Sequence, residues 1–111
     1  MQEVPKATKR LVRHWAGVAH DRDLSRALLD LRAQFDRWQR REITAYDLNQ
    51  LIHEFHQGPS REIWTRYATN HLAPAVASAV AAGVLTREEL PVPLLEHLAG
   101  LIEFFEADRM Q

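Results

Sequence analysis

Residues 43–67 read ITAYDLNQLIHEFHQGPSREIWTRY, and they contain the clearest helix signals in the chain. Thr44 is a good N-cap, because its hydroxyl oxygen can accept a hydrogen bond from the free backbone N–H groups of the first helical turn. Asp47 follows three residues later and completes a short form of the capping box. Apolar residues then recur at helical spacing, at Leu48, Leu51, Ile52 and Phe55. These features predict a helix that begins directly after Thr44.

Gly58 and Pro59 are typical of the end of that helix. Glycine readily adopts the left-handed conformation that closes a helix, and proline does not continue one. Ser60 can cap a second helix. The apolar stripe of this second helix comprises Ile63, Trp64, Tyr67 and His71, which we expect in the core. We therefore predict a central helical hairpin over about 44–70, with its tight turn at Gly58.

The length of 111 residues suits a single helical domain, 1–111, with one hydrophobic core. The absence of cysteine excludes disulfides and thiolate chemistry. No apolar run reaches the length of a membrane span, and the first ten residues lack the apolar core of a signal peptide. We expect a cytoplasmic protein that does not enter a membrane.

Two further apolar stripes precede the hairpin. Residues 6–19 form a basic amphipathic pattern. Residues 22–41 carry a heptad-like stripe at Leu24, Leu28, Leu31, Phe35 and Trp38. The two stripes are out of phase with each other. Either a break near residues 20–23 separates two helices, or one long helix shows two faces.

The second half of the chain also has helical patterns. Small residues after Pro74 predict a helix that packs closely inside the bundle, with Gly83 as its C-cap. Thr86 and Glu89 form a full capping box, and a last helix is expected over about 93–108. No period-two pattern predicts a strand. The predicted fold class is therefore all-α, an irregular bundle of five or six helices.

The net charge of −1 hides an uneven distribution. Residues 1–41 have a balance of +5, and residues 42–111 have a balance of −6. One interpretation is that the halves partly neutralise each other in the fold. The alternative is a nucleic-acid-associated regulator that binds phosphates through the basic residues Lys6, Lys9, Arg10 and Arg13.

A group of polar side chains in the predicted hairpin could bind a ligand. These candidate binding residues are Tyr46, Asn49, His53, His56 and Arg61. The two histidines are three residues apart and could supply half of a metal site. The segment HEFH lacks the spacing of the H-E-x-x-H motif, however, and the sequence places no third ligand beside it. We therefore expect neither a metal nor a cofactor.

The last predicted helix carries large apolar residues around about half of its circumference, which is wider than one-sided packing needs. Phe104 lies at one edge of this apolar surface. We expect a homodimer that buries Leu101 and Phe104 in a two-fold contact.

The sequence lacks the motifs of nucleophilic catalysis and of phosphate-binding loops. The leading functional hypothesis is a non-enzymatic protein–protein interaction or regulatory module. The nucleic-acid-associated regulator is the second hypothesis. The third is a metal-dependent enzyme built on His53 and His56.

Overall fold

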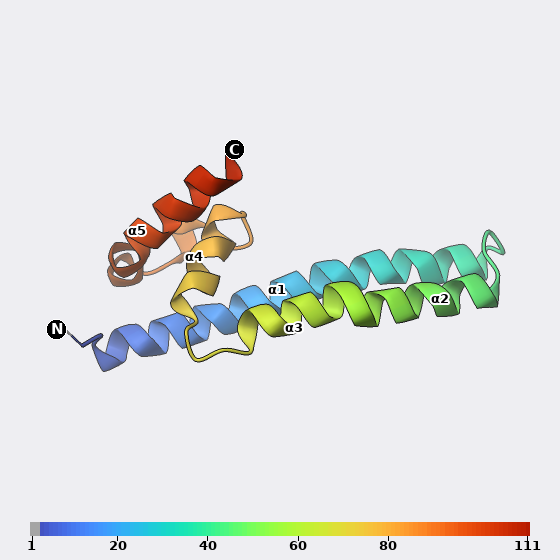
Figure 1. The fold of residues 1–111 in the computed structure, drawn as a ribbon, viewed down its shortest axis with the longest axis horizontal. Helices are drawn as coiled ribbons and strands as arrows, with labels where there is room; N and C mark the ends of the chain where they lie inside the picture. Colours follow the sequence, from blue (N-terminus) through green and yellow to red (C-terminus); the bar gives the residue numbers. More distant parts are fainter. Residues whose placement is uncertain (1–2) are drawn as a thin grey trace. The chain divides into compact units, whose positions relative to one another are not determined.

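The protein is described by a computed structural model that covers residues 3–111. The predicted all-α class is confirmed, since the described residues include helices and no strand. The α-helices are α1 (Lys6–Gln39), α2 (Ala45–Phe55), α3 (Arg61–Tyr67), α4 (Ala73–Ala81) and α5 (Val92–Arg109). A π-helical segment, η1 (His56–Ser60), joins α2 to α3, and a short 3₁₀ turn, η2 (Arg87–Glu89), precedes α5 (Figure 1).

The prediction of a central hairpin over 44–70 is wrong at its turn. Gly58 has no positive φ, and Ser60 and Arg61 both have right-handed helical dihedrals. Ser60 makes no capping hydrogen bond through its side chain. Because α2, η1 and α3 follow one another without a break, the described residues contain four continuous helices instead of five or six (Figure 1).

The π-helical segment explains how proline fits inside this helix. A proline in a regular α-helix removes one backbone hydrogen bond, and its ring clashes with a carbonyl of the preceding turn. A π turn inserts one extra residue and widens the helix locally. Pro59 lies inside this widened turn, so the chain continues through Pro59 where the sequence pattern predicted a stop.

A hairpin does form, one connection earlier in the chain. The antiparallel partner of α2–η1–α3 is the second part of α1 (Figure 1). Arg41 adopts a left-handed φ of 62° directly after α1. The amide N–H groups of Arg41 and Glu42 donate to the carbonyl oxygens of Trp38 and Arg37, at 3.0 and 2.9 Å. These two bonds form a Schellman motif, which closes α1 and reverses the chain.

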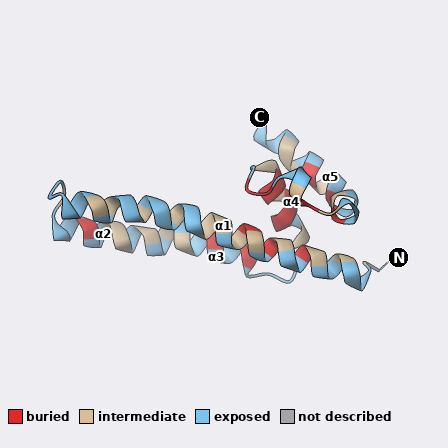
Figure 2. Cartoon of the chain, turned by 180° about the vertical axis from the view of Figure 1, so that it is seen from behind, coloured by how far each residue is buried: buried red, intermediate tan, exposed pale blue. Residues whose placement is uncertain are grey.

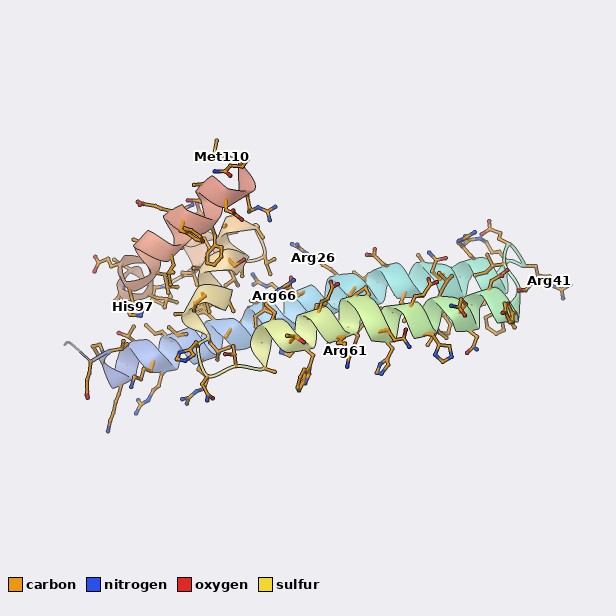
Figure 3. All side chains as sticks on the ribbon, in the orientation of Figure 1. Arg26, Arg41, Arg61, Arg66, His97 and Met110 are labelled. Atoms are coloured by element: carbon orange, nitrogen blue, oxygen red, sulfur yellow. The ribbon has the colours of Figure 1, made fainter. Side chains whose placement is uncertain are left out.

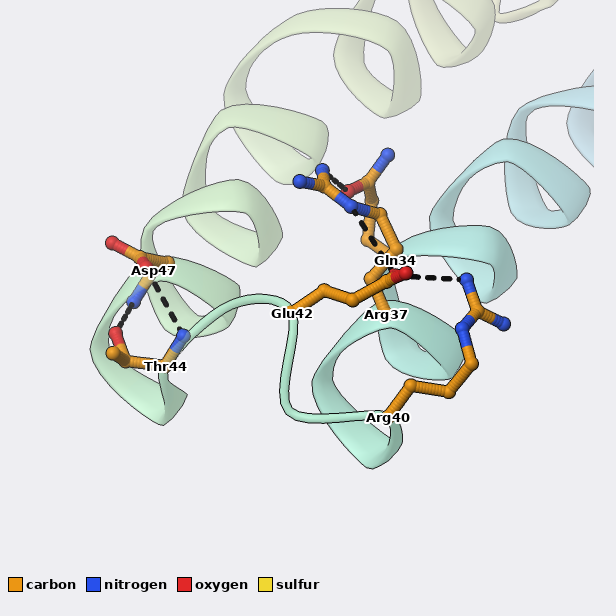
Figure 4. A network of polar contacts seen from close by, with 6 residues as sticks. All are labelled: Gln34, Arg37, Arg40, Glu42, Thr44 and Asp47. Atoms are coloured by element: carbon orange, nitrogen blue, oxygen red, sulfur yellow. Dashed lines mark hydrogen bonds and ion pairs between the residues drawn. The ribbon is translucent and has the colours of Figure 1, made fainter.

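The start of α2 follows the sequence prediction. Thr44 and Asp47 exchange two hydrogen bonds of 3.0 Å, as the capping box requires (Figure 4). The bond from the Thr44 backbone N–H, with the one involving its side chain, holds the pKa of the Asp47 carboxyl below its usual range. An exposed ion pair between Arg40 and Glu42, at 2.9 Å, lies in the same turn (Figure 4).

α1 is one continuous helix, so the alternative with one long helix is correct. Residues 20–23 contain neither glycine nor proline, and Asp23 makes contacts that are not those of a helix cap. Its Oδ2 accepts hydrogen bonds from the Tyr67 hydroxyl at 2.6 Å and from Arg66 at 3.0 Å. These bonds join α1 to α3 at the open end of the hairpin.

The contacts of the chain divide it into two compact units. The first is the α4–α5 unit, which comprises the described part of Met1–His20 together with Thr69–Gln111. The second is the hairpin unit, Asp21–Ala68. The expectation of one domain over 1–111 stays a prediction.

The α4–α5 unit contains most of the apolar core. α4 is built from small residues, and it packs directly against α5. Leu85, Leu94, Leu98 and Ile102 are almost completely buried there. Gly83, with φ 78°, closes α4 as predicted. The Thr86–Glu89 capping box is also confirmed, although it starts the 3₁₀ turn η2.

Candidate functional site

Exposed apolar side chains are concentrated in the hairpin unit. Among the described residues, only three side chains of this unit are buried: Leu48, Ile63 and Tyr67. Six large apolar side chains are exposed: Leu28, Leu29, Phe35, Trp38, Tyr46 and Trp64. Figure 2 shows the same result, with exposed and intermediate colours along most of α1, α2 and α3 in this unit. The hairpin unit therefore presents much apolar surface to solvent.

The geometry of two helices explains this exposure. A helix in a two-helix hairpin can cover only the part of its partner that faces it, whereas the apolar stripe of a bundle helix is wider. Leu24 and Leu31 lie at the centre of the α1 stripe and are half-buried. Leu28 and Phe35 belong to the same stripe but lie at its edge, and they are 46% and 39% exposed.

A shallow apolar groove runs along the other edge of the same stripe. Its volume is about 240 Å³. The apolar part of its lining is Ala27, Leu31, Leu51, Phe55 and Pro59. Asp30 from α1 and Glu54 from α2 supply the acidic groups of the lining. The groove thus carries acidic side chains, whereas Leu28 and Phe35 lie on the other side of the α1 stripe.

The predicted binding residues Tyr46, Asn49, His53, His56 and Arg61 are all exposed on α2, η1 and α3. The structure brings two of them together, since His56 and Arg61 line a depression of about 450 Å³ with Trp64. Tyr46, Asn49 and His53 do not line it. Figure 3 shows Arg61 extending outward from the helix.

Trp64 and His71 correct the predicted stripe of the second helix. Trp64 is 66% exposed, and His71 is exposed and lies beyond the end of α3. The extra residue in η1 rotates the following residues about the helix axis, so Ile63 and Tyr67 face inward and Trp64 does not. The sequence prediction started a new helix after Gly58 and therefore did not include this rotation.

Tyr67 links α3 to α1 through its hydroxyl group. Burial, followed by the hydrogen bond to Asp23, raises the pKa of the Tyr67 hydroxyl above its usual range. The hydroxyl therefore stays protonated and donates to the carboxylate at any pH near neutrality. This arrangement satisfies Asp23, whose side chain is only 12% exposed.

The metal hypothesis gains no third ligand. No group of three or more histidine, cysteine or acidic side chains within residues 3–111 is arranged to hold a metal ion. His53 and His56 are both exposed, and a metal bound by these two side chains alone would remain largely coordinated by water.

The predicted dimer residues lie on α5. Phe104 is 63% exposed and Leu101 is half-buried. Phe104 contacts Phe105 edge to face, with ring centroids 5.3 Å apart. The homodimer through α5 stays a prediction, as does nucleic-acid binding by Lys6, Lys9, Arg10 and Arg13, all of which are exposed on α1.

Comparison with protein-family models, with curated proteins and with solved structures found no match for this chain. None of the helices in residues 3–111 combines the length and the apolar character that a membrane span requires.

Proposed function

We propose that this chain is a non-enzymatic protein–protein interaction module, and that its hairpin unit pairs with the hairpin unit of a second copy. The pair would form an antiparallel four-helix bundle. The observation that carries this proposal is the set of six large exposed apolar side chains on a hairpin with three buried ones. Leu28 and Phe35 share one face of α1, and exposed apolar side chains that adjoin one another are typical of a site of protein association.

Charge supports a second copy as the partner. The hairpin unit contains eight arginines and eight acidic residues, so its net charge is zero. Two such units can approach each other without net electrostatic repulsion. Two-fold symmetry also suits a surface that must match itself.

The two edges of the hairpin differ in their suitability for this contact. At about 100° per residue, Leu28 and Phe35 lie on one side of Leu24 around the α1 circumference, and Asp30 lies on the opposite side. A two-fold contact centred on the groove would bring Asp30 and Glu54 close to their own copies, which costs free energy. We therefore assign the contact to the edge with Leu28 and Phe35.

Sedimentation velocity tests the proposal at about 10 μM protein, a concentration at which a dimer of micromolar affinity is populated. Wild type is expected to sediment as a dimer. The variant Leu28→Glu plus Phe35→Glu is expected to sediment as a monomer with unchanged helical circular dichroism, because each substitution would bury a charge in the contact. Leu29→Glu is the matched control, since Leu29 is 60% exposed and lies about 100° away from Leu28.

Phe104→Lys separates this contact from the one predicted on α5. A dimer that survives Phe104→Lys and is lost in the Leu28 and Phe35 double variant supports the hairpin. A monomeric wild type contradicts self-association altogether. A dimer lost only in Phe104→Lys moves the interface to α5.

A further inference from the structure

The α4–α5 unit contains a basic pocket that none of the sequence motifs indicated. Its volume is about 550 Å³. Five side chains that can donate hydrogen bonds to an anion line it: Lys9, Arg13, Asn70, His71 and His97. They come from α1, from the connection before α4, and from α5. Figure 3 shows His97 on α5, near the first turns of α1.

The donor side chains of this pocket have no partner among the described residues. Within residues 3–111, no ion pair and no hydrogen bond involves the side chains of Lys9, Arg13, His71 or His97. The acidic residues of α5 do not line the pocket. Lys9 and Arg13 are four residues apart, so they share one face of α1 and supply two positive charges to the same pocket.

The start of α4 adds donors on the same side. Leu72, Ala73 and Pro74 line the pocket, and no side chain caps this end of α4. The uncapped first turn leaves backbone N–H groups without an intrahelical partner. The partial positive charge of a helix N-terminus also favours an anion.

The remaining lining is apolar. Val4, Val12 and Leu72 contribute to it, and Val12 is 9% exposed. A ligand that fits both parts has an anionic group and a small apolar body. Because a phosphate monoester carries a charge of about −1.5 to −2 at neutral pH, its charge matches those of Lys9 and Arg13 better than a carboxylate does.

We infer that this pocket binds a small phosphate monoester, with Lys9, Arg13, His71 and His97 around the phosphate and the apolar body against Val12 and Leu72. The inference is independent of the proposed dimer, since every lining residue belongs to the α4–α5 unit.

Isothermal titration calorimetry with phenyl phosphate in 150 mM salt tests the inference. Wild type is expected to bind with a Kd of about 0.1–1 mM, the affinity that a ligand of this size reaches with a few good contacts. Inorganic phosphate is expected to bind about tenfold more weakly, because it leaves the apolar lining uncovered. Phenol, which lacks the anion, is expected not to bind measurably.

Two pairs of substitutions on α1 provide a matched comparison. Lys9→Gln plus Arg13→Gln removes both cations from the pocket and is expected to weaken phenyl phosphate binding by at least about tenfold. Lys6→Gln plus Arg10→Gln removes the same residue types at the same spacing, outside the pocket, and is expected to change the affinity by less than about twofold. All four residues are exposed, so both variants should keep the wild-type circular dichroism.

Two results would overturn the inference. One is the absence of phenyl phosphate binding by wild type at about 10 mM ligand, which would leave the pocket without useful affinity. The other is an equal loss in both pairs of variants, which would show that the anion responds to the general positive charge of α1 and not to the pocket.

Discussion

The α4–α5 unit contains fourteen of the seventeen buried apolar side chains within residues 3–111, and the hairpin unit contains three. Conversely, the hairpin unit carries six of the nine large apolar side chains that are exposed. The difference follows from architecture. In the α4–α5 unit, short helices and a connecting turn surround a common centre, whereas two antiparallel helices have only one shared face.

This contrast agrees with the different roles proposed for the two units. A unit with its own core can hold a pocket in a defined shape, as the basic pocket requires. A unit with an incomplete core gains most from a partner that covers it, as the proposed bundle requires.

The largest effect is expected for leucine truncation. Leu98→Ala in α5 should lower the free energy of unfolding by about 2–5 kcal/mol, because Leu98 is completely buried and its loss leaves a cavity. Leu29→Ala in the hairpin unit should lower it by less than about 0.5 kcal/mol, because that side chain is 60% exposed. Urea unfolding followed by circular dichroism measures both. Equal losses would mean that Leu29 is buried in solution and that the contrast between the units is wrong.

The next effect is on the free energy of unfolding, which alanine substitution should change in opposite directions at two glycines. Gly83→Ala should destabilise the protein by about 1 kcal/mol, because alanine resists the φ of 78° found there. Gly58→Ala should stabilise it by about 0.5–1 kcal/mol, because Gly58 has helical dihedrals and a Cβ would meet no atom within 4 Å. Thermal unfolding of the two variants provides the measurement. Destabilisation by Gly58→Ala would show that Gly58 forms the left-handed turn that the sequence predicted at this position.

The smallest expected effect is a change with pH in the stabilisation that the Thr44–Asp47 cap provides. The Asp47 pKa is lowered in the folded state, so its contribution to stability is present above the ordinary aspartate pKa of about 4 and is lost as the pH falls through the folded pKa. Thr44→Ala removes the partner side chain. The difference in stability between wild type and Thr44→Ala should therefore narrow between pH 7 and pH 2.5, measured by urea unfolding at a series of pH values.

Thr65→Ala is the control for the pH series. Thr65 is an exposed residue inside α3, with no capping contact. The stability difference that it produces should not change with pH. A Thr44→Ala difference that is equally constant would show that the Asp47 carboxylate contributes nothing to the cap.

The parts of the fold that local chemistry determines could be predicted from the sequence. The Thr44–Asp47 and Thr86–Glu89 capping boxes and the left-handed Gly83 are confirmed, because each depends on residues within one turn of the chain. The helix predicted over 93–108 is α5, Val92–Arg109. The class of fold follows from such local signals alone.

The helix that passes through Gly58 and Pro59 could not be predicted in this way. In a regular helix each residue is turned by about 100° from the one before it. Ile63 and Tyr67 would therefore point about 60° and 100° away from Leu48 around the helix axis. That loss of phase is typical of a helix end. The π turn η1 contains one extra residue, and this residue brings Ile63 and Tyr67 back to the side of the helix that carries Leu48. A regular period of about 3.6 residues does not describe such a turn.

The candidate sites show the same limit. The basic pocket joins side chains at positions 9, 13, 71 and 97, and no local motif links residues so far apart. The exposure of Leu28 and Phe35 also depends on how many helices surround α1, which the heptad-like pattern does not reveal. The pattern correctly indicated an apolar stripe but not the fraction of it that the chain itself covers.

The π turn at residues 56–60 has a consequence for how this helix tolerates changes in chain length. Because the turn holds one residue more than a regular helix needs, loss of Gln57 combined with Pro59→Ala would leave Leu48 and Ile63 facing the same direction as before. The middle of α1 contains no π turn, so the loss of one residue there would turn every later side chain of that helix by about 100°. The helix around Pro59 can thus lose one residue without rearranging the hairpin, provided that Pro59 is replaced as well, because the regular helix left behind would not accommodate its ring.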